Sequence, residues 1–290
     1  MKLEESLKQK RFVVTSEIHL PMGTDIQDVI QPMDRIKSRM EALSLPELKI
    51  DAWVGNTIGI CRAIKDQQVE PILLTPCREK SRIDLQEHLV QAFEAGIRNI
   101  LTFTEDYRIS GDSLQELMFF HVDTGKLFSV IESLRGGHDI SGKELSDRPE
   151  FFIGSGVDAH WGKEIPDMAL KEMEELARLG TNFFVTTPVF DLDSFEQFMK
   201  RVFPLQIPVI AEVLLVGSLE MGLFLNEHVK AGMVPPHLIE KLARSPDKER
   251  ASMEVIRDLL KGLKDLCQGV HFVPIEMEDP ALKESHRLKL

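Results

Sequence analysis

Short apolar runs rich in β-branched residues alternate with amphipathic segments along the whole chain. Each run is bounded by turn or polar residues, which is typical of a strand buried in a sheet. We expect eight strands, at residues 11–19, 48–54, 69–75, 99–104, 151–157, 182–186, 207–215 and 269–274. Apolar residues at helical spacing predict helices between them, at residues 83–96, 167–180, 193–203 and 218–232.

This order of elements narrows the fold class to two architectures. Strands that alternate with helices form either an open doubly wound sheet or a closed (β/α)8 barrel. The count of eight favours the barrel, and no G-x-G-x-x-G loop follows the first strand, as a dinucleotide-binding sheet would require. We therefore predict one (β/α)8 TIM barrel domain over residues 1–290, with a helical insert near 233–266. Its functional residues should lie at the carboxyl ends of the strands.

Acidic residues gather at those predicted strand ends. They are Glu17, Glu105, Asp106, Asp158 and Glu212. Carboxylates that share a partly dry pocket raise one another's pKa, so one of them can stay protonated near neutral pH and donate a proton. Glu17 is the best candidate, because a charge inside the apolar strand "VVTSEIHL" is costly without a purpose. A structural ion pair of Glu17 with Arg62 or Arg78 is the alternative.

A metal site is a rival use of the same acids. Glu17 and His19 stand at i and i+2 on one strand face, and with Asp106 and Asp158 they could bind a divalent ion. No H-x-x-x-H or C-x-x-C motif supports such a site, so we expect no metal. Cys77 has no assigned histidine base and is interpreted as a packing thiol.

Composition and charge exclude several classes of partner. A net charge of -12 argues against a nucleic-acid backbone, and 43% hydrophobic residues are enough for a large packed core. Three cysteines without a C-x-x-C spacing fit a reducing cytoplasm. The N-terminus lacks the apolar core of a signal peptide, and no apolar run approaches the ~20 residues of a membrane helix. We expect a cytoplasmic homo-oligomer with no membrane or nucleic-acid partner.

Five segments together resemble the methylenetetrahydrofolate reductase family, especially the short forms of acetogenic and related anaerobic bacteria. They keep the family's order and spacing from about Phe12 to Pro274, and they read "TSEIHLP", "LLTPCREKSRIDLQEHLVQAFEAGIRNILTFTED", "FFIGSGV", "LARLGTNFFVTTPVFDLDSFEQF" and "GVHFVPI". The resemblance implies a (β/α)8 oxidoreductase that binds FAD. It also implies that NAD(P)H or a partner redox subunit supplies electrons, and that 5,10-methylenetetrahydrofolate is reduced to 5-methyltetrahydrofolate.

The resemblance also implies roles for individual residues. Glu17 takes the position of the general acid that opens the imidazolidine ring, and Asp106 takes that of an aspartate beside the flavin and the pterin. The further positions that it assigns to the cofactor are Asn56, Thr75, Thr104, Glu105, Val157, Asp158, His160 and Leu176. The further positions that it assigns to the folate are Thr187 and Glu212.

Several of these positions depart from the family pattern. Leu74 replaces a histidine, Glu105 a glycine, Leu176 a lysine expected near the flavin phosphates, and Thr187 a glutamine expected at the pterin. A pyrophosphate prefers backbone N–H groups, glycines and cations. Three readings therefore stay open. The first is an active flavin-dependent reductase, and the second is a reductase-like barrel without FAD that binds a folate or another one-carbon carrier as a partner subunit. The third is a barrel of different chemistry.

Overall fold

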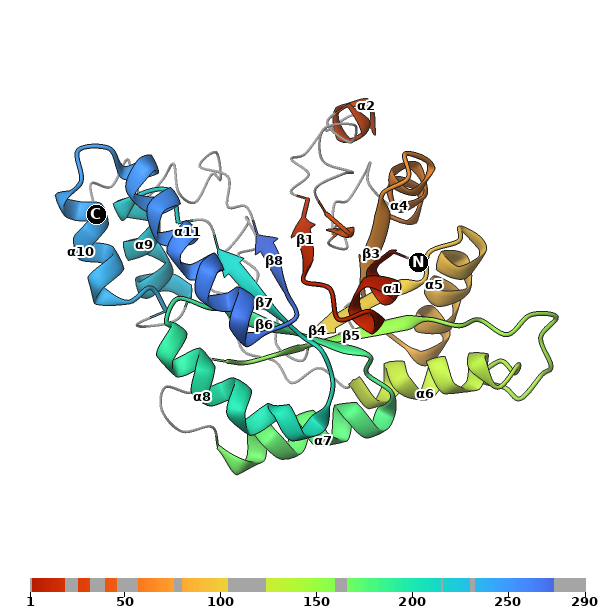
Figure 1. Cartoon of the computed structure of the whole chain (residues 1–290). Helices are drawn as coiled ribbons and strands as arrows, with labels where there is room; N and C mark the ends of the chain where they lie inside the picture. Colours follow the sequence, from red (N-terminus) through yellow and green to blue (C-terminus); the bar gives the residue numbers. More distant parts are fainter. Residues whose placement is uncertain are drawn as a thin grey trace.

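Eight parallel strands close into a barrel in sequence order, which confirms the predicted (β/α)8 fold (Figure 1). The computed structural model describes residues 2–18, 26–31, 40–45, 57–75, 80–103, 124–159, 166–214, 216–229 and 233–273. The strands are β1 Val13–Glu17, β2 Ala42–Leu45, β3 Glu70–Leu74, β4 Asn99–Phe103, β5 Phe152–Val157, β6 Phe183–Pro188, β7 Val209–Leu214 and β8 Gly269–Val273. The pairing of β1 with β8, in which Val13 neighbours Gly269, closes the ring.

The second strand of the barrel differs from the prediction. It is Ala42–Leu45, whereas the prediction was residues 48–54, all of which lie outside the described residues. The segment "ALSL" is short and is buried on both faces, so it shows no alternation of apolar and polar residues. The segment "LKIDAWV" does alternate, and it therefore gave the stronger strand signal.

Helices follow the strands around the outside of the barrel (Figure 1). Those of the first half are α1 Lys2–Lys8, α2 Ile26–Ile30, α4 Thr57–Asp66, α5 Arg82–Glu94 and α6 Thr124–Arg135. Those of the second half are α7 Asp167–Leu179, α8 Leu192–Val202, α9 Leu219–Phe224, α10 Pro236–Arg244 and α11 Lys248–Leu266. A 3-10 turn at Phe203–Leu205 follows α8, and a π-helical turn at Leu225–Val229 follows α9.

Local capping chemistry sets the ends of the predicted helices. The Ser81 hydroxyl accepts from the Asp84 N–H, and the Asp84 carboxylate accepts from the Ser81 N–H, which together form a capping box before α5. At the other end of its helix, Gly180 caps α7 with φ +107°, a left-handed conformation that favours glycine.

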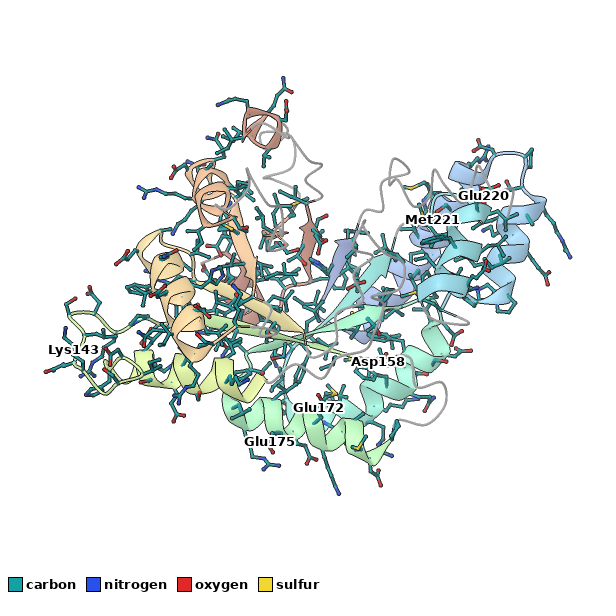
Figure 2. The ribbon with its side chains drawn as sticks, turned by 180° about the vertical axis from the view of Figure 1, so that it is seen from behind. Lys143, Asp158, Glu172, Glu175, Glu220 and Met221 are labelled. Atoms are coloured by element: carbon teal, nitrogen blue, oxygen red, sulfur yellow. The ribbon has the colours of Figure 1, made fainter. Side chains whose placement is uncertain are left out.

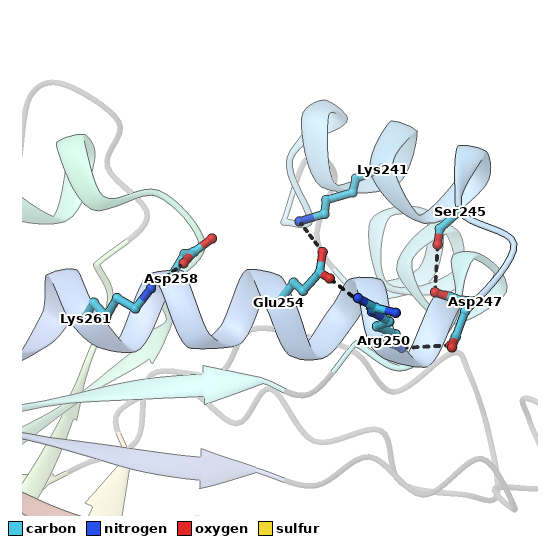
Figure 3. Close-up of polar contacts among 7 residues, drawn as sticks. All are labelled: Lys241, Ser245, Asp247, Arg250, Glu254, Asp258 and Lys261. Atoms are coloured by element: carbon cyan, nitrogen blue, oxygen red, sulfur yellow. Dashed lines mark hydrogen bonds and ion pairs between the residues drawn. The ribbon is translucent and has the colours of Figure 1, made fainter.

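The predicted helical insert consists of α10 and α11, which lie together with α9 at one side of the barrel (Figure 1). Asp247 caps α11 by accepting from the Arg250 N–H at 3.0 Å, and Glu254 lies 3.3 Å from Arg250 and 3.8 Å from Lys241 (Figure 3). These exposed ion pairs contribute little to stability. A separate apolar cluster that includes Met221, Leu238 and the last residue of β7 holds the three helices against the barrel.

The inside of the barrel is a small apolar core that α1 covers at the amino-terminal end of the strands. One cluster joins Leu3 and Leu7 of α1 to residues from seven of the strands, which only side chains inside the ring can do. These strand residues are Val13, Ala42, Ile72, Leu74, Leu101, Phe152, Phe183, Val185 and Ile210. Since side chains alternate along a strand, this cluster shows which residues of each strand point inward.

Candidate active site at the carboxyl end of the barrel

Four of the predicted site residues face the inside of the barrel at its carboxyl end. They are Glu17 of β1, Asp158 after β5, Thr187 of β6 and Glu212 of β7. Glu17, Asp158 and Glu212 each lie an even number of residues after an inward-facing residue of their own strand, namely Val13, Phe152 and Ile210. The register of β6 is irregular between Val185 and Pro188, so Thr187 is placed at the rim by its hydrogen bond to Asp158. The structure thus brings together, at one rim, three acids and a hydroxyl that are distant in the sequence.

The Thr187 side chain holds the Asp158 carboxylate in place. Its hydroxyl donates to Asp158 Oδ1 at 3.0 Å and accepts from the Ala159 backbone N–H at 3.0 Å. Thr187 is buried, whereas Asp158 is half-buried at the barrel (Figure 2). A threonine at this position, where the family pattern has a glutamine, therefore orients a neighbouring acid at the site.

A buried histidine, His271 of β8, lies beneath this rim. Its Nδ1 is 2.9 Å from Thr15 Oγ1, and its Nε2 is 3.3 Å from Ser44 Oγ. Ser44 belongs to β2, and β1 lies between β8 and β2, so the imidazole spans the inward face of β1. Thr15 precedes Glu17 by two residues on that face, which places the ring directly below Glu17.

Burial controls the charge of this histidine. Desolvation lowers the pKa of His271 from 6.5 to about 4, so the imidazole is neutral at pH 7. Sequence reasoning did not choose His271 as a site residue. The available signal was its position: it is an inward-facing polar residue in the strand "GVHFV", two residues after Gly269.

Three of the predicted cofactor residues have buried side chains. Thr75, Val157 and Leu176 are only 1%, 7% and 2% exposed. Val157 and Leu176 belong to the apolar layer between the strands and the helices. Leu176 lies on the buried, apolar face of α7, so its side chain packs in the core, and its assignment to the flavin stays a prediction.

The remaining predicted positions cannot be placed against this rim. Asn56, Thr104, Glu105, Asp106 and His160 lie outside the described residues. The proposed meeting of Glu17 with Asp106 therefore stays a prediction. Of the two arginines considered as structural partners of Glu17, Arg78 also lies outside the described residues, and Arg62 is exposed on α4.

The described positions assigned to the cofactor include no cation for the phosphates of FAD. The described positions assigned to the cofactor supply one acid, Asp158, and three buried side chains. An anion ~4 Å from a phosphate charge costs about 4 kcal/mol at an effective dielectric of about 20. We therefore derive no step of the chemistry through a flavin.

The described ranges contain neither a metal-binding cluster nor a membrane-spanning helix. Within them, no three His, Cys, Asp or Glu side chains are grouped closely enough to hold a metal ion. Within the same ranges, no helix has the length and apolar character needed to cross a lipid bilayer.

Comparisons with known proteins agree with the barrel and point to one family. A family model described as methylenetetrahydrofolate reductase matches residues 2–289. Among solved structures, the chain is similar to an uncharacterized protein from Clostridium thermocellum that binds two copies of 5-methyl-5,6,7,8-tetrahydrofolic acid. The identity is 12% and the TM-score 0.62, with 99% of this chain and 97% of that chain covered.

A second solved structure shares the fold without sharing the length. It is the carboxyl transferase domain of Rhizobium etli pyruvate carboxylase with pyruvate, at 9% identity and a TM-score of 0.53. The similarity covers 93% of this chain and 41% of that chain. Structural likeness at these identities shows the barrel fold alone. No curated protein sequence matches the chain.

Proposed function

The chain belongs to the methylenetetrahydrofolate reductase family, and on this premise we propose that it binds a reduced folate at the carboxyl end of its barrel, where Glu17 acts on it as an acid. The observation that carries the proposal is the inward position of Glu17 at a rim that it shares with Asp158 and Glu212. The ligand of the similar Clostridium thermocellum protein, 5-methyl-5,6,7,8-tetrahydrofolic acid, supports the class of substrate.

The proposed step is the opening of the five-membered ring of 5,10-methylenetetrahydrofolate. Protonated Glu17 donates its proton to N10, the bond between the methylene carbon and N10 breaks with its electron pair on N10, and an N5 iminium cation forms. Glu17 is left as a carboxylate, and no electrons are exchanged with the protein. Reduction of the iminium to a methyl group needs a hydride, and the use of FAD and NAD(P)H for that reduction stays a prediction.

The neighbouring acids support this step electrostatically. Negative charge on Asp158 and Glu212 disfavours a further negative charge nearby, so it favours the protonated form of Glu17 before the reaction. The same charges stabilise the iminium cation once it forms. The Asp158 carboxylate, held by Thr187, also suits the N–H donors of a pterin ring, because a carboxylate can accept two parallel hydrogen bonds.

Titration calorimetry with 5-methyltetrahydrofolate and 5,10-methylenetetrahydrofolate tests the proposal. We expect binding near micromolar Kd, about -8 kcal/mol, for the wild type and for Glu17→Gln. Formation of 5-methyltetrahydrofolate in the presence of FAD and NADH should be lost in Glu17→Gln. The matched control is Glu175→Gln, the same change on the outer helix α7 (Figure 2), which should behave as wild type. If neither folate binds the wild type, the proposal is wrong.

One observation favours a second candidate, a folate-binding partner subunit without FAD. Val157 and Leu176 pack in the apolar layer around the barrel, so these two predicted flavin contacts direct their side chains into the core. The visible absorbance spectrum of the purified protein, before and after addition of FAD, separates the two candidates. Flavin bands that stay with the protein through gel filtration support the reductase; a colourless protein that still binds folate supports the partner subunit.

A further inference from the structure

One arrangement of hydrogens satisfies all three contacts of the polar layer beneath Glu17. Thr15 Oγ1 donates to the Val270 carbonyl at 3.2 Å, which uses its one hydrogen. The Thr15 oxygen can then only accept from His271, so the single ring hydrogen of the neutral imidazole is on Nδ1. Nε2 is consequently an acceptor, and Ser44 Oγ must donate its hydrogen to it.

The sheet register places Ser44 beside Glu17. The two residues are Cα partners in the pairing of β1 with β2, and both point into the barrel. Ser44 is fully buried, and its hydrogen is directed to His271. Toward Glu17 the Ser44 hydroxyl therefore presents only oxygen lone pairs. Such a group can accept a hydrogen bond from a carboxylic acid, and it repels a carboxylate.

We propose that His271 is a positioning residue that acts through Ser44 to keep Glu17 in its protonated, acidic form. By accepting the Ser44 hydrogen, His271 prevents Ser44 from donating to the Glu17 carboxylate. The catalytic meaning of this arrangement rests on the proposed function, whereas the arrangement itself can be measured without any folate.

The described strand residues at this rim act in the same direction. They are the acids Asp158 after β5 and Glu212 of β7 and the apolar Leu74 of β3, while the Thr187 hydroxyl of β6 donates to Asp158. None of the eight strands, within their described bounds, contains a lysine or an arginine. Their basic group is His271, which burial keeps neutral.

The first test uses the wild-type protein. Nitrogen NMR of the histidine rings reports which nitrogen carries the hydrogen and whether the ring gains a proton. The proposal requires a hydrogen on Nδ1 of His271 and no titration of that ring from about pH 5 to about pH 8. A hydrogen on Nε2, or protonation within that range, overturns the proposal. A single-residue variant, His271→Gln, assigns the resonance.

The second test follows the Glu17 carboxyl carbon by NMR as the pH is varied, with Glu17→Gln to assign the signal. In His271→Phe the Ser44 hydrogen is released and can donate to the carboxylate, so the titration midpoint should fall by about one pH unit, a tenfold change in the acid–base ratio. In the double variant with Ser44→Ala the fall should disappear. His271→Gln should restore the wild-type midpoint, because its amide oxygen can accept from Ser44.

This test has a matched control variant and defined outcomes that would overturn the proposal. Ser155 is a fully buried serine of β5 that pairs with Thr181 at 2.8 Å on the outer side of the barrel, so Ser155→Ala should leave the midpoint unchanged. An unshifted midpoint in folded His271→Phe, or an equal fall in the double variant, overturns the proposal. If His271→Phe does not fold, the nitrogen measurement on the wild type decides. Absent folate binding with a shifted midpoint would refute the proposed function and leave this inference standing.

Discussion

The Thr187 hydroxyl offers the sharpest test of how the rim is built. Thr187→Val replaces the hydroxyl by a methyl group of nearly the same shape, so it removes the hydrogen bonds that this hydroxyl makes with Ala159 and Asp158. The Ala159 N–H loses its acceptor, and Asp158 loses a donor, each at 3.0 Å. A neutral bond contributes about 1 kcal/mol and a bond to a charged group about 2 kcal/mol. Because Asp158 is half-buried, we expect a total loss of about 2 kcal/mol.

This loss should appear in both stability and binding. Urea denaturation followed by circular dichroism measures the free energy of unfolding. The melting temperature should fall by about 3 °C. Titration with 5-methyltetrahydrofolate should show about tenfold weaker binding, equivalent to about 1.4 kcal/mol, because Asp158 is no longer oriented toward the pterin. The control is Thr181→Val. It removes a buried hydroxyl that pairs with Ser155 of β5 and lies just before the amino-terminal end of β6.

The control separates loss of stability from loss of the site. Thr181→Val should also lower the unfolding free energy, and it should leave folate affinity unchanged. If Thr187→Val unfolds at the wild-type urea concentration, the two hydrogen bonds contribute nothing and the reasoning fails. If Thr187→Val and Thr181→Val weaken folate binding equally, the role assigned to Asp158 is wrong.

Three further predictions concern the core. In Gly269→Ala the new methyl carbon would lie 2.5 Å from the Val13 carbonyl oxygen, so urea denaturation should show a loss of about 2 kcal/mol in the free energy of unfolding. In the control Gly217→Ala the methyl carbon would have no described atom within 4 Å, so this free energy should change by less than about 0.5 kcal/mol. Burial raises the pKa of Cys61 to about 12, so a thiol reagent at neutral pH should label it only as fast as the protein unfolds, and mass spectrometry showing immediate labelling would contradict this. Unfolded His271 gains a proton near its ordinary pKa of 6.5, whereas folded His271 gains one only near a pKa of about 4. The contribution of neutral His271 to the free energy of unfolding is therefore complete above pH 6.5, and it falls by up to about 3 kcal/mol as the pH drops to 4. Urea denaturation at a series of pH values should show a smaller fall in His271→Gln.

The barrel could be predicted because most of its strands have a clear sequence pattern. Runs such as "NILTF" and "FFVTTP" are strongly β-prone, and a glycine ends the helix before each of them. β2 could not be predicted, since a four-residue strand buried on both faces carries neither length nor alternation. Its place is decided by tertiary pairing with β1 and β3, which a local pattern does not contain.

A site residue could be predicted from the sequence only where its polarity differed from that of its neighbours in the chain. Glu17 is a charge in an apolar strand, and the structure places it inside the barrel rim. His271 gave no such signal, because its partners Thr15 and Ser44 are 256 and 227 residues away in the sequence. Leu176 shows the opposite case: its helical spacing indicated a buried position, which the structure shows, whereas its assignment to a cofactor rests on the family resemblance alone.

The closure of the ring by its first and last strands has a consequence during biosynthesis. A nascent chain that has released β1 through β7 from the ribosome still has two unpaired sheet edges, because β8 is needed to join β7 to β1. The polar layer beneath Glu17 is also incomplete until His271 is in place. Chaperones that act during translation therefore meet a sheet with exposed edges. The polar layer at the rim is complete only after synthesis has passed residue 271.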